Sequence, residues 1–117
     1  MKDVSAYLKH IREAIAKIEK YTKGGQKKFM EDTMIQDSVI RNLEIIGEAA
    51  RNLPTDLRKS SPKVPWRSIT GMRNVLIHEY FGVDLDIVWK VVTQRLPILK
   101  SHALAMLAKN KRSRKKA

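Results

Sequence analysis

The sequence predicts an all-α protein, a four-helix bundle of the up-and-down type with a kinked last helix. Two observations lead to this prediction. Apolar residues recur with the 3.6-residue period of an α-helix, and no segment shows the two-residue alternation that is typical of a strand. The periodic stretches are separated by short connections that contain glycine and proline, as in helical bundles.

The first helix is predicted from the start of the chain to Gly24-Gly25, a pair that breaks helices. Its apolar positions are Val4, Leu8, Ile11, Ile15 and Ile18. The second helix is predicted to follow Asp32-Thr33, where Thr33 and Gln36 have the spacing of a capping box, and to end before Pro54. Its apolar stripe is Ile35, Val39, Leu43, Ile46 and Ala50.

Residues 54–65 contain three prolines and are predicted to be an irregular connection, with one helical turn around 56–59. Pro65 suits the first position of a third helix, over 66–80, that closes at Gly82. A fourth helix is predicted to begin near Asp84 or Asp86, whose carboxylates suit a helix N-terminus. Its apolar positions are Ile87, Val88, Val91, Leu96, Leu99, Leu104 and Leu107.

Pro97 should kink this last helix, because proline removes a backbone hydrogen bond. We expect residues 1–108 to form the bundle and residues 109–117 to form a short disordered basic tail.

The charge balance points to a polyanionic partner. The net charge is +12 and the pI is near 10.2, and six of the cations lie in 109–117. Such an excess favours nucleic acid through counterion release, although a solvated, solubilising tail explains it as well. The chain has no cysteine, no apolar run long enough to span a membrane and no secretory segment, so we expect a cytoplasmic protein.

One histidine has neighbours that suit chemistry. On a helix, Asn74 and His78 share one stripe and Arg73 and Tyr80 share the adjacent one. Arginine can bind a phosphate and histidine can move a proton, so this set could support cleavage of RNA by its own 2′-hydroxyl. The alternative from spacing alone is a set of ordinary surface hydrogen bonds. The acidic residues show no metal-site spacing, so no metal or cofactor is expected.

Residues 73–80, Arg-Asn-Val-Leu-Ile-His-Glu-Tyr, match the R-x4-H-x-Y motif of the HEPN-domain ribonucleases. The chain resembles their HepT subgroup, the toxins of HepT–MntA (type VII) toxin–antitoxin systems, over about residues 1–105. Further matching strings are Leu-Glu-Ile-Ile-Gly-Glu-Ala at 43–49, Val-Pro-Trp at 64–66 and Tyr-Phe-Gly at 80–82.

The resemblance implies a HEPN-type bundle and a role for each motif residue. Arg73 would stabilise the scissile phosphate, His78 would act as general acid or base, and Asn74 would support them. Tyr80 would receive AMP from an MntA-like nucleotidyltransferase antitoxin, which silences the toxin. The resemblance also implies a homodimer that brings two motif helices together in one cleft.

Glu48 is a supporting candidate. Gly47 before it should permit close helix packing, which would bring Glu48 near the third helix and a pairing with Arg73 or Arg67. A solvated Glu48 is the alternative. Gly71 either lets two motif helices approach or packs within its own helix.

Two other functions remain open. The chain could be a non-catalytic module that binds a nucleotidyltransferase and presents substrate or nucleotide to it. A basic helical DNA-binding protein is a third hypothesis, although no helix-turn-helix spacing supports it.

Overall fold

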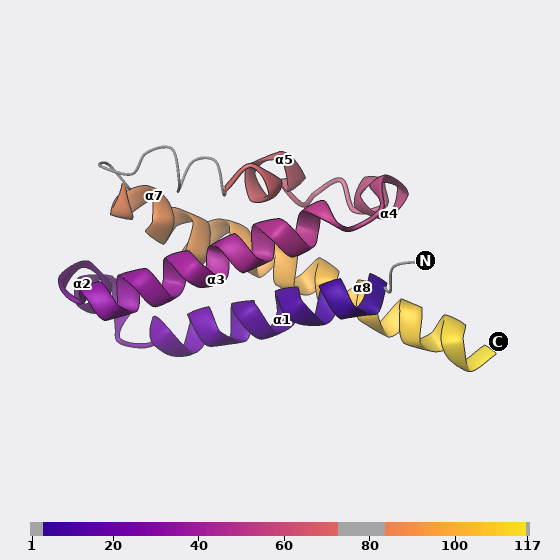
Figure 1. Ribbon diagram of the computed structural model, residues 1–117, viewed down its shortest axis with the longest axis horizontal. Coiled ribbons are helices and arrows are strands. Elements are labelled where there is room, and N and C mark those ends of the chain that lie inside the picture. The colour runs from indigo at the N-terminus through magenta and orange to yellow at the C-terminus, as the bar shows by residue number, and fades with distance from the viewer. Residues whose placement is uncertain (1–3, 73–83, 117) are drawn as a thin grey trace.

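The computed structural model describes residues 4–72 and 84–116, with side chains through Asn110. Within these ranges every regular element is a helix, which confirms the all-α prediction. Figure 1 shows two long helices, α1 (Val4–Tyr21) and α3 (Thr33–Arg51), beside a third long helical run that ends in α8. The run consists of α7 (Leu85–Lys90), the π-helical segment η1 (Val91–Arg95) and α8 (Leu96–Lys116).

The core lies between these three long helical segments. α1 packs against both α3 and α8, and it runs antiparallel to each of them (Figure 1). The predicted stripes of α1 and α3 face inward, since Ile11, Leu43 and Ile46 are fully buried. Burying a side chain of this size is worth about 1.5–3 kcal/mol, so this shared core is the main support of the bundle.

The connection between α1 and α3 contains a helix that the sequence pattern did not predict. α1 ends at Tyr21, and Gly25, with φ of 90°, opens the short helix α2 (Gly25–Glu31). Phe29 of α2 is fully buried, and its ring centroid lies 5.2 Å from that of Trp89 on α7. α2 therefore covers one end of the core.

The predicted capping box at the start of α3 is wrong. Asp32 is the N-cap, and its carboxylate accepts hydrogen bonds from the backbone N–H groups of Met34 (2.9 Å) and Ile35 (3.2 Å). Gln36 instead donates from Nε2 to the carbonyl oxygens of Phe29 and Met30. The Asp32 carboxylate one residue earlier satisfies free N–H groups of the first turn, so Thr33 is the first helical residue and not the cap.

Two short helices lie above α3 in Figure 1, α4 (Thr55–Lys59) and α5 (Trp66–Thr70). α4 confirms the predicted helical turn. The uninterrupted helix expected from 66 to 80 is wrong at Gly71, where α5 ends, and residues 73–83 lie outside the described residues.

The last helical run corrects two expectations. The helix is irregular near Pro97, as predicted, because the π-helical segment η1 lies just before this proline and Leu96 donates its N–H to Val91 O. Ile87 and Leu104 are exposed, whereas Val88, Val91, Leu96 and Leu99 are buried as predicted. The tail was expected to be disordered, but α8 continues through it to Lys116. Residues 109–116 include no glycine or proline that would end the helix. None of the described helices is long and apolar enough to cross a membrane.

Candidate active site

Four of the predicted site residues, Arg73, Asn74, His78 and Tyr80, lie in the motif segment, residues 73–83, outside the described residues. Their positions and roles stay predictions. The structure does describe the supports at both ends of this segment, together with Glu48 on α3.

The support before the motif segment is α5 and the residue Met72. Trp66 fixes the start of α5 by donating from Nε1 to Ser61 O at 3.0 Å. At its other end Gly71 donates its N–H to Arg67 O at 3.0 Å, and Thr70 Oγ1 donates to Trp66 O. Met72 is buried, so the chain enters the motif segment directly from a residue anchored in the core.

Gly47 confirms the close packing that the sequence predicted. A Cβ atom placed at Gly47 would lie only 3.0 Å from the carbonyl oxygen of Ile69, which is itself fully buried. The backbones of α3 and α5 are therefore in direct contact. A Cβ atom at Gly71 would lie 3.0 Å from the carbonyl oxygen of Arg67, one turn earlier on α5.

Glu48 follows Gly47 on α3 and is largely exposed. Its carboxylate oxygen Oε2 lies 3.9 Å from Arg51 Nη2, one helical turn later. This ion pair holds the side chain along α3, and Asn52 Nδ2 donates to the Glu48 carbonyl at 2.9 Å. The expected pairing with Arg73 falls outside the described residues.

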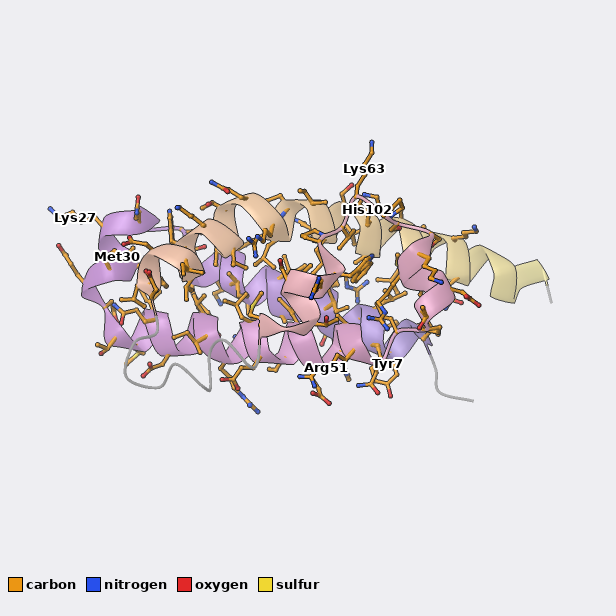
Figure 2. All side chains as sticks on the ribbon, turned by 90° about the horizontal axis from the view of Figure 1, so that it is seen from above. Tyr7, Lys27, Met30, Arg51, Lys63 and His102 are labelled. Carbon is orange, nitrogen blue, oxygen red and sulfur yellow. The ribbon has the colours of Figure 1, made fainter. Side chains whose placement is uncertain are left out.

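Glu48 also lines a groove between α1 and α3 that sequence reasoning missed. The groove has a volume of about 340 Å³. It lies on the edge of the molecule where Figure 2 labels Tyr7 and Arg51. Its lining residues are Tyr7, His10, Arg41, Glu44, Ile45, Glu48, Ala49 and Asn52. Arg41 and Glu44 form an ion pair at 3.7 Å on its wall.

A signal for this groove does exist in the sequence. Tyr7 and His10 have i, i+3 spacing and Glu44 and Glu48 have i, i+4 spacing, so each pair shares one helix face. The spacing does not show that this face of α1 and this face of α3 lie side by side.

The support after the motif segment is the start of α7. Asp84 caps this helix, since its Oδ1 accepts from the N–H groups of Asp86 (2.9 Å) and Ile87 (3.3 Å). This confirms one of the two predicted starts. The contact between Trp89 and Phe29 then holds α7 against α2.

No group of three or more histidine or acidic side chains in 4–72 and 84–110 is arranged to hold a metal ion. His78 and Glu79 lie outside that range. The described residues therefore define where the motif segment begins, after Met72, and where it ends, before Asp84.

The chain matches one protein-family model, described as Ribonuclease HepT-like, over residues 11–106. The matched range begins in α1, contains the whole motif segment and ends in α8.

Curated relatives carry ribonuclease names. A Thermococcus cleftensis protein named "Probable ribonuclease HepT" is 47% identical over 95 residues, which are 80% of this chain and 86% of that protein. A "Putative RNase" of Caldanaerobacter subterraneus is 40% identical over 112 residues, covering 95% of this chain and all of the relative.

A longer relative comes from Methanocaldococcus jannaschii and is named "Gamma-glutamylcyclotransferase and putative RNase". It is 45% identical over 117 residues, which cover 97% of this chain and 53% of the relative, so the chain spans about half the length of that protein. No solved structure matches the chain.

Proposed function

Because the chain belongs to the HepT-like ribonuclease family, we propose that it is a metal-independent endoribonuclease and the toxin of a type VII toxin–antitoxin system. The observation that carries this proposal is the complete R-x4-H-x-Y string, Arg73 to Tyr80, inside the matched residues. Relatives with ribonuclease names that are nearly full-length matches support the activity.

The proposed reaction is a transesterification within the RNA. The ribose 2′-oxygen attacks the adjacent phosphorus while the bond from phosphorus to the 5′-oxygen breaks, which leaves a 2′,3′-cyclic phosphate and a 5′-hydroxyl. Arg73 stabilises the extra negative charge on the phosphate, and His78 moves a proton to or from one of the two oxygens. Asn74 and Glu48 hold this pair in position.

The proposed control is covalent. In this step Tyr80 Oη attacks the α-phosphate of ATP on an MntA-like nucleotidyltransferase antitoxin, and pyrophosphate leaves. The attached AMP places a phosphodiester anion next to Arg73, where it competes with the RNA phosphate. Replacing Tyr80 with phenylalanine should therefore abolish AMP addition, as read by intact mass of the co-expressed protein.

A substrate with a single 2′-deoxy nucleotide at the cut position tests the reaction. We expect wild-type protein to cut the all-RNA strand and to leave the substituted strand intact, because the nucleophile is missing. Cleavage of both strands with equal rate would contradict the mechanism. If the unmodified dimer binds its partner but cuts neither strand of several RNAs, the non-catalytic module becomes the better description.

A further inference from the structure

Two long stretches of this chain that contain no carboxylate hold 13 of its 24 lysines and arginines. The last acidic residue is Asp86, and residues 87–117 hold nine lysines and arginines. Residues 57–72 form the second stretch, with four cations, Arg58, Lys59, Lys63 and Arg67. A shorter stretch without a carboxylate, residues 20–30, holds four lysines between Glu19 and Glu31.

The structure brings these two stretches together. A groove of about 380 Å³ is lined by Leu57, Ser60 and Ser61 from the α4 region and by α8 residues from His102 to Asn110. Lys63 and His102 lie on the same edge of the molecule in Figure 2. Lys59, Lys63 and Arg67 are all exposed, so their charges face solvent.

The far end of the charged surface is the arm, residues 109–116, which continues α8 beyond the body of the bundle (Figure 1). Six of its eight residues are lysine or arginine. On the other side of α8 a second groove carries Lys9 and Arg12 of α1, and no carboxylate is among the described residues that line it. The arm therefore begins beside two further cations on this side of α8.

The near end of the surface leads to the motif segment. Arg67 lies on α5, and α5 passes through Gly71 and Met72 directly into residue 73. The elements that carry the two stretches thus extend from the arm, past the α4 region, to α5 and the residue before the motif segment.

We propose that this route is a binding track for single-stranded RNA, formed by the arm with Lys59, Lys63 and Arg67, that holds substrate outside the cleavage site. Naming RNA rests on the proposed function. RNA suits these cations because each lysine or arginine that neutralises a phosphate releases counterions and adds to the binding free energy. A membrane surface fits less well, since the arm has no apolar residue to insert.

The track predicts an effect that depends on RNA length. The helical run from Leu85 to Lys116 is roughly 45 Å long, in keeping with the 50 Å long axis of the molecule. A dinucleotide that fills only the cleavage site cannot reach the arm, whereas a long RNA can. Loss of the arm's charge should raise KM for long RNA, leave kcat unchanged, and leave dinucleotide cleavage unchanged.

The test compares two variants with the same total charge. The arm variant replaces Lys111, Arg112, Lys115 and Lys116 with glutamine, which keeps helix propensity. The control variant makes four such replacements at the opposite end of the bundle, at Lys20, Lys23, Lys27 and Lys28, in the stretch that Glu19 and Glu31 flank. Each set is built on His78→Ala, and binding to a labelled long single-stranded RNA is measured across salt concentrations.

We expect the arm variant to bind about tenfold more weakly at low salt and to lose two to three units, roughly, from the slope of log affinity against log salt. The control variant should lose less than about one unit. Equal losses in both would show an effect of net charge alone and overturn the track. No loss in either, or binding of the arm to anionic vesicles in preference to RNA, would also overturn it.

These outcomes are separate from those that test the proposed function. Binding through the arm without any cleavage by wild-type protein would refute the ribonuclease and keep the track. Cleavage of long RNA with unchanged KM, when the same four arm replacements are made in a chain that keeps His78, would refute the track and keep the ribonuclease.

Discussion

At the scale of single residues, Gly47 has the clearest structural task. It lies where α3 and α5 touch backbone to backbone, because a Cβ atom would meet the Ile69 carbonyl oxygen at 3.0 Å. Both ends of α5 are held in place, because Trp66 at its start is hydrogen-bonded to Ser61 and Ile69 near its end is buried. Gly47 therefore sets the position from which the motif segment starts.

We predict that Gly47→Ala lowers the free energy of unfolding by about 1–2 kcal/mol. Overpacking a core contact costs about 1–3 kcal/mol, and the better helix propensity of alanine returns up to about 1 kcal/mol. Urea unfolding followed by circular dichroism measures the difference. RNA cleavage should also fall, because α5 shifts away from α3.

Gly24→Ala is the matched control. Its added Cβ atom would meet Lys28 Cγ at 3.0 Å and Lys28 Cβ at 3.1 Å, and its φ of −72° suits alanine. Lys28 is exposed and lies on a short helix with one buried residue, so this contact can relax by a small shift and we expect a change within about 0.5 kcal/mol. Equal destabilisation by both replacements would show that the contact with α5 is not what requires glycine at 47.

Prediction from sequence succeeded for single residues whose type has one common structural role at that position. Gly47 in the middle of an apolar helix pattern indicated a close approach, and Asp84 indicated a helix start. It did not find the groove that His10 lines, because this groove exists only where α1 and α3 adjoin.

At the scale of elements, the start of α3 depends on a single carboxylate. Asp32 accepts two backbone hydrogen bonds, and Thr33 is already helical. We predict that Asp32→Ala costs about 1 kcal/mol of stability and that Thr33→Ala changes stability by less than about 0.5 kcal/mol. Thermal unfolding of the two variants decides between Asp32 and the capping box, since the reverse order of effects would restore Thr33 as the cap.

The long helices were predictable from periodicity, whereas the short ones were not. α1 and α3 carry four or more buried apolar residues each at helical spacing. α2 has seven residues and one buried side chain, Phe29, so it lacks enough positions to establish a period. Its existence follows from tertiary contact with Trp89, which the local sequence does not encode.

The last helical run shows the same limit at its two ends. Proline at 97 predicted an irregularity, and the irregularity is the π-helical segment just before it. The composition of 109–116 suggested disorder because of its charge, yet its residues include no helix breaker. The high charge density favours disorder here, whereas the helix propensity of these residues favours a helix, and the backbone is helical.

At the scale of the whole molecule, the proposed chemistry needs more than one chain. Strand cleavage gains from both an acid and a base, each worth about 10²–10⁴-fold, and each chain offers one motif histidine. A two-fold interface would supply both from the same residue, His78. The homodimer is therefore part of the proposed mechanism.

A heterodimer of wild-type and His78→Ala chains, purified with two different tags, tests this requirement. We expect its cleavage rate to fall far below half that of the wild-type dimer, because every composite site has lost one proton-transfer group. A rate close to half would mean that each chain carries an independent site.

The most direct test of the central claim is cleavage of RNA in the presence of EDTA by protein whose intact mass shows an unmodified Tyr80. Wild type, His78→Ala and the control His102→Ala, which alters a histidine in the groove beside α4, are compared. We predict that wild type and His102→Ala cut the RNA, and that His78→Ala loses at least about 100-fold in rate. Equal cleavage by all three variants, or none by verified unmodified wild-type dimer, would contradict the account of this chain as a metal-independent ribonuclease acting through His78.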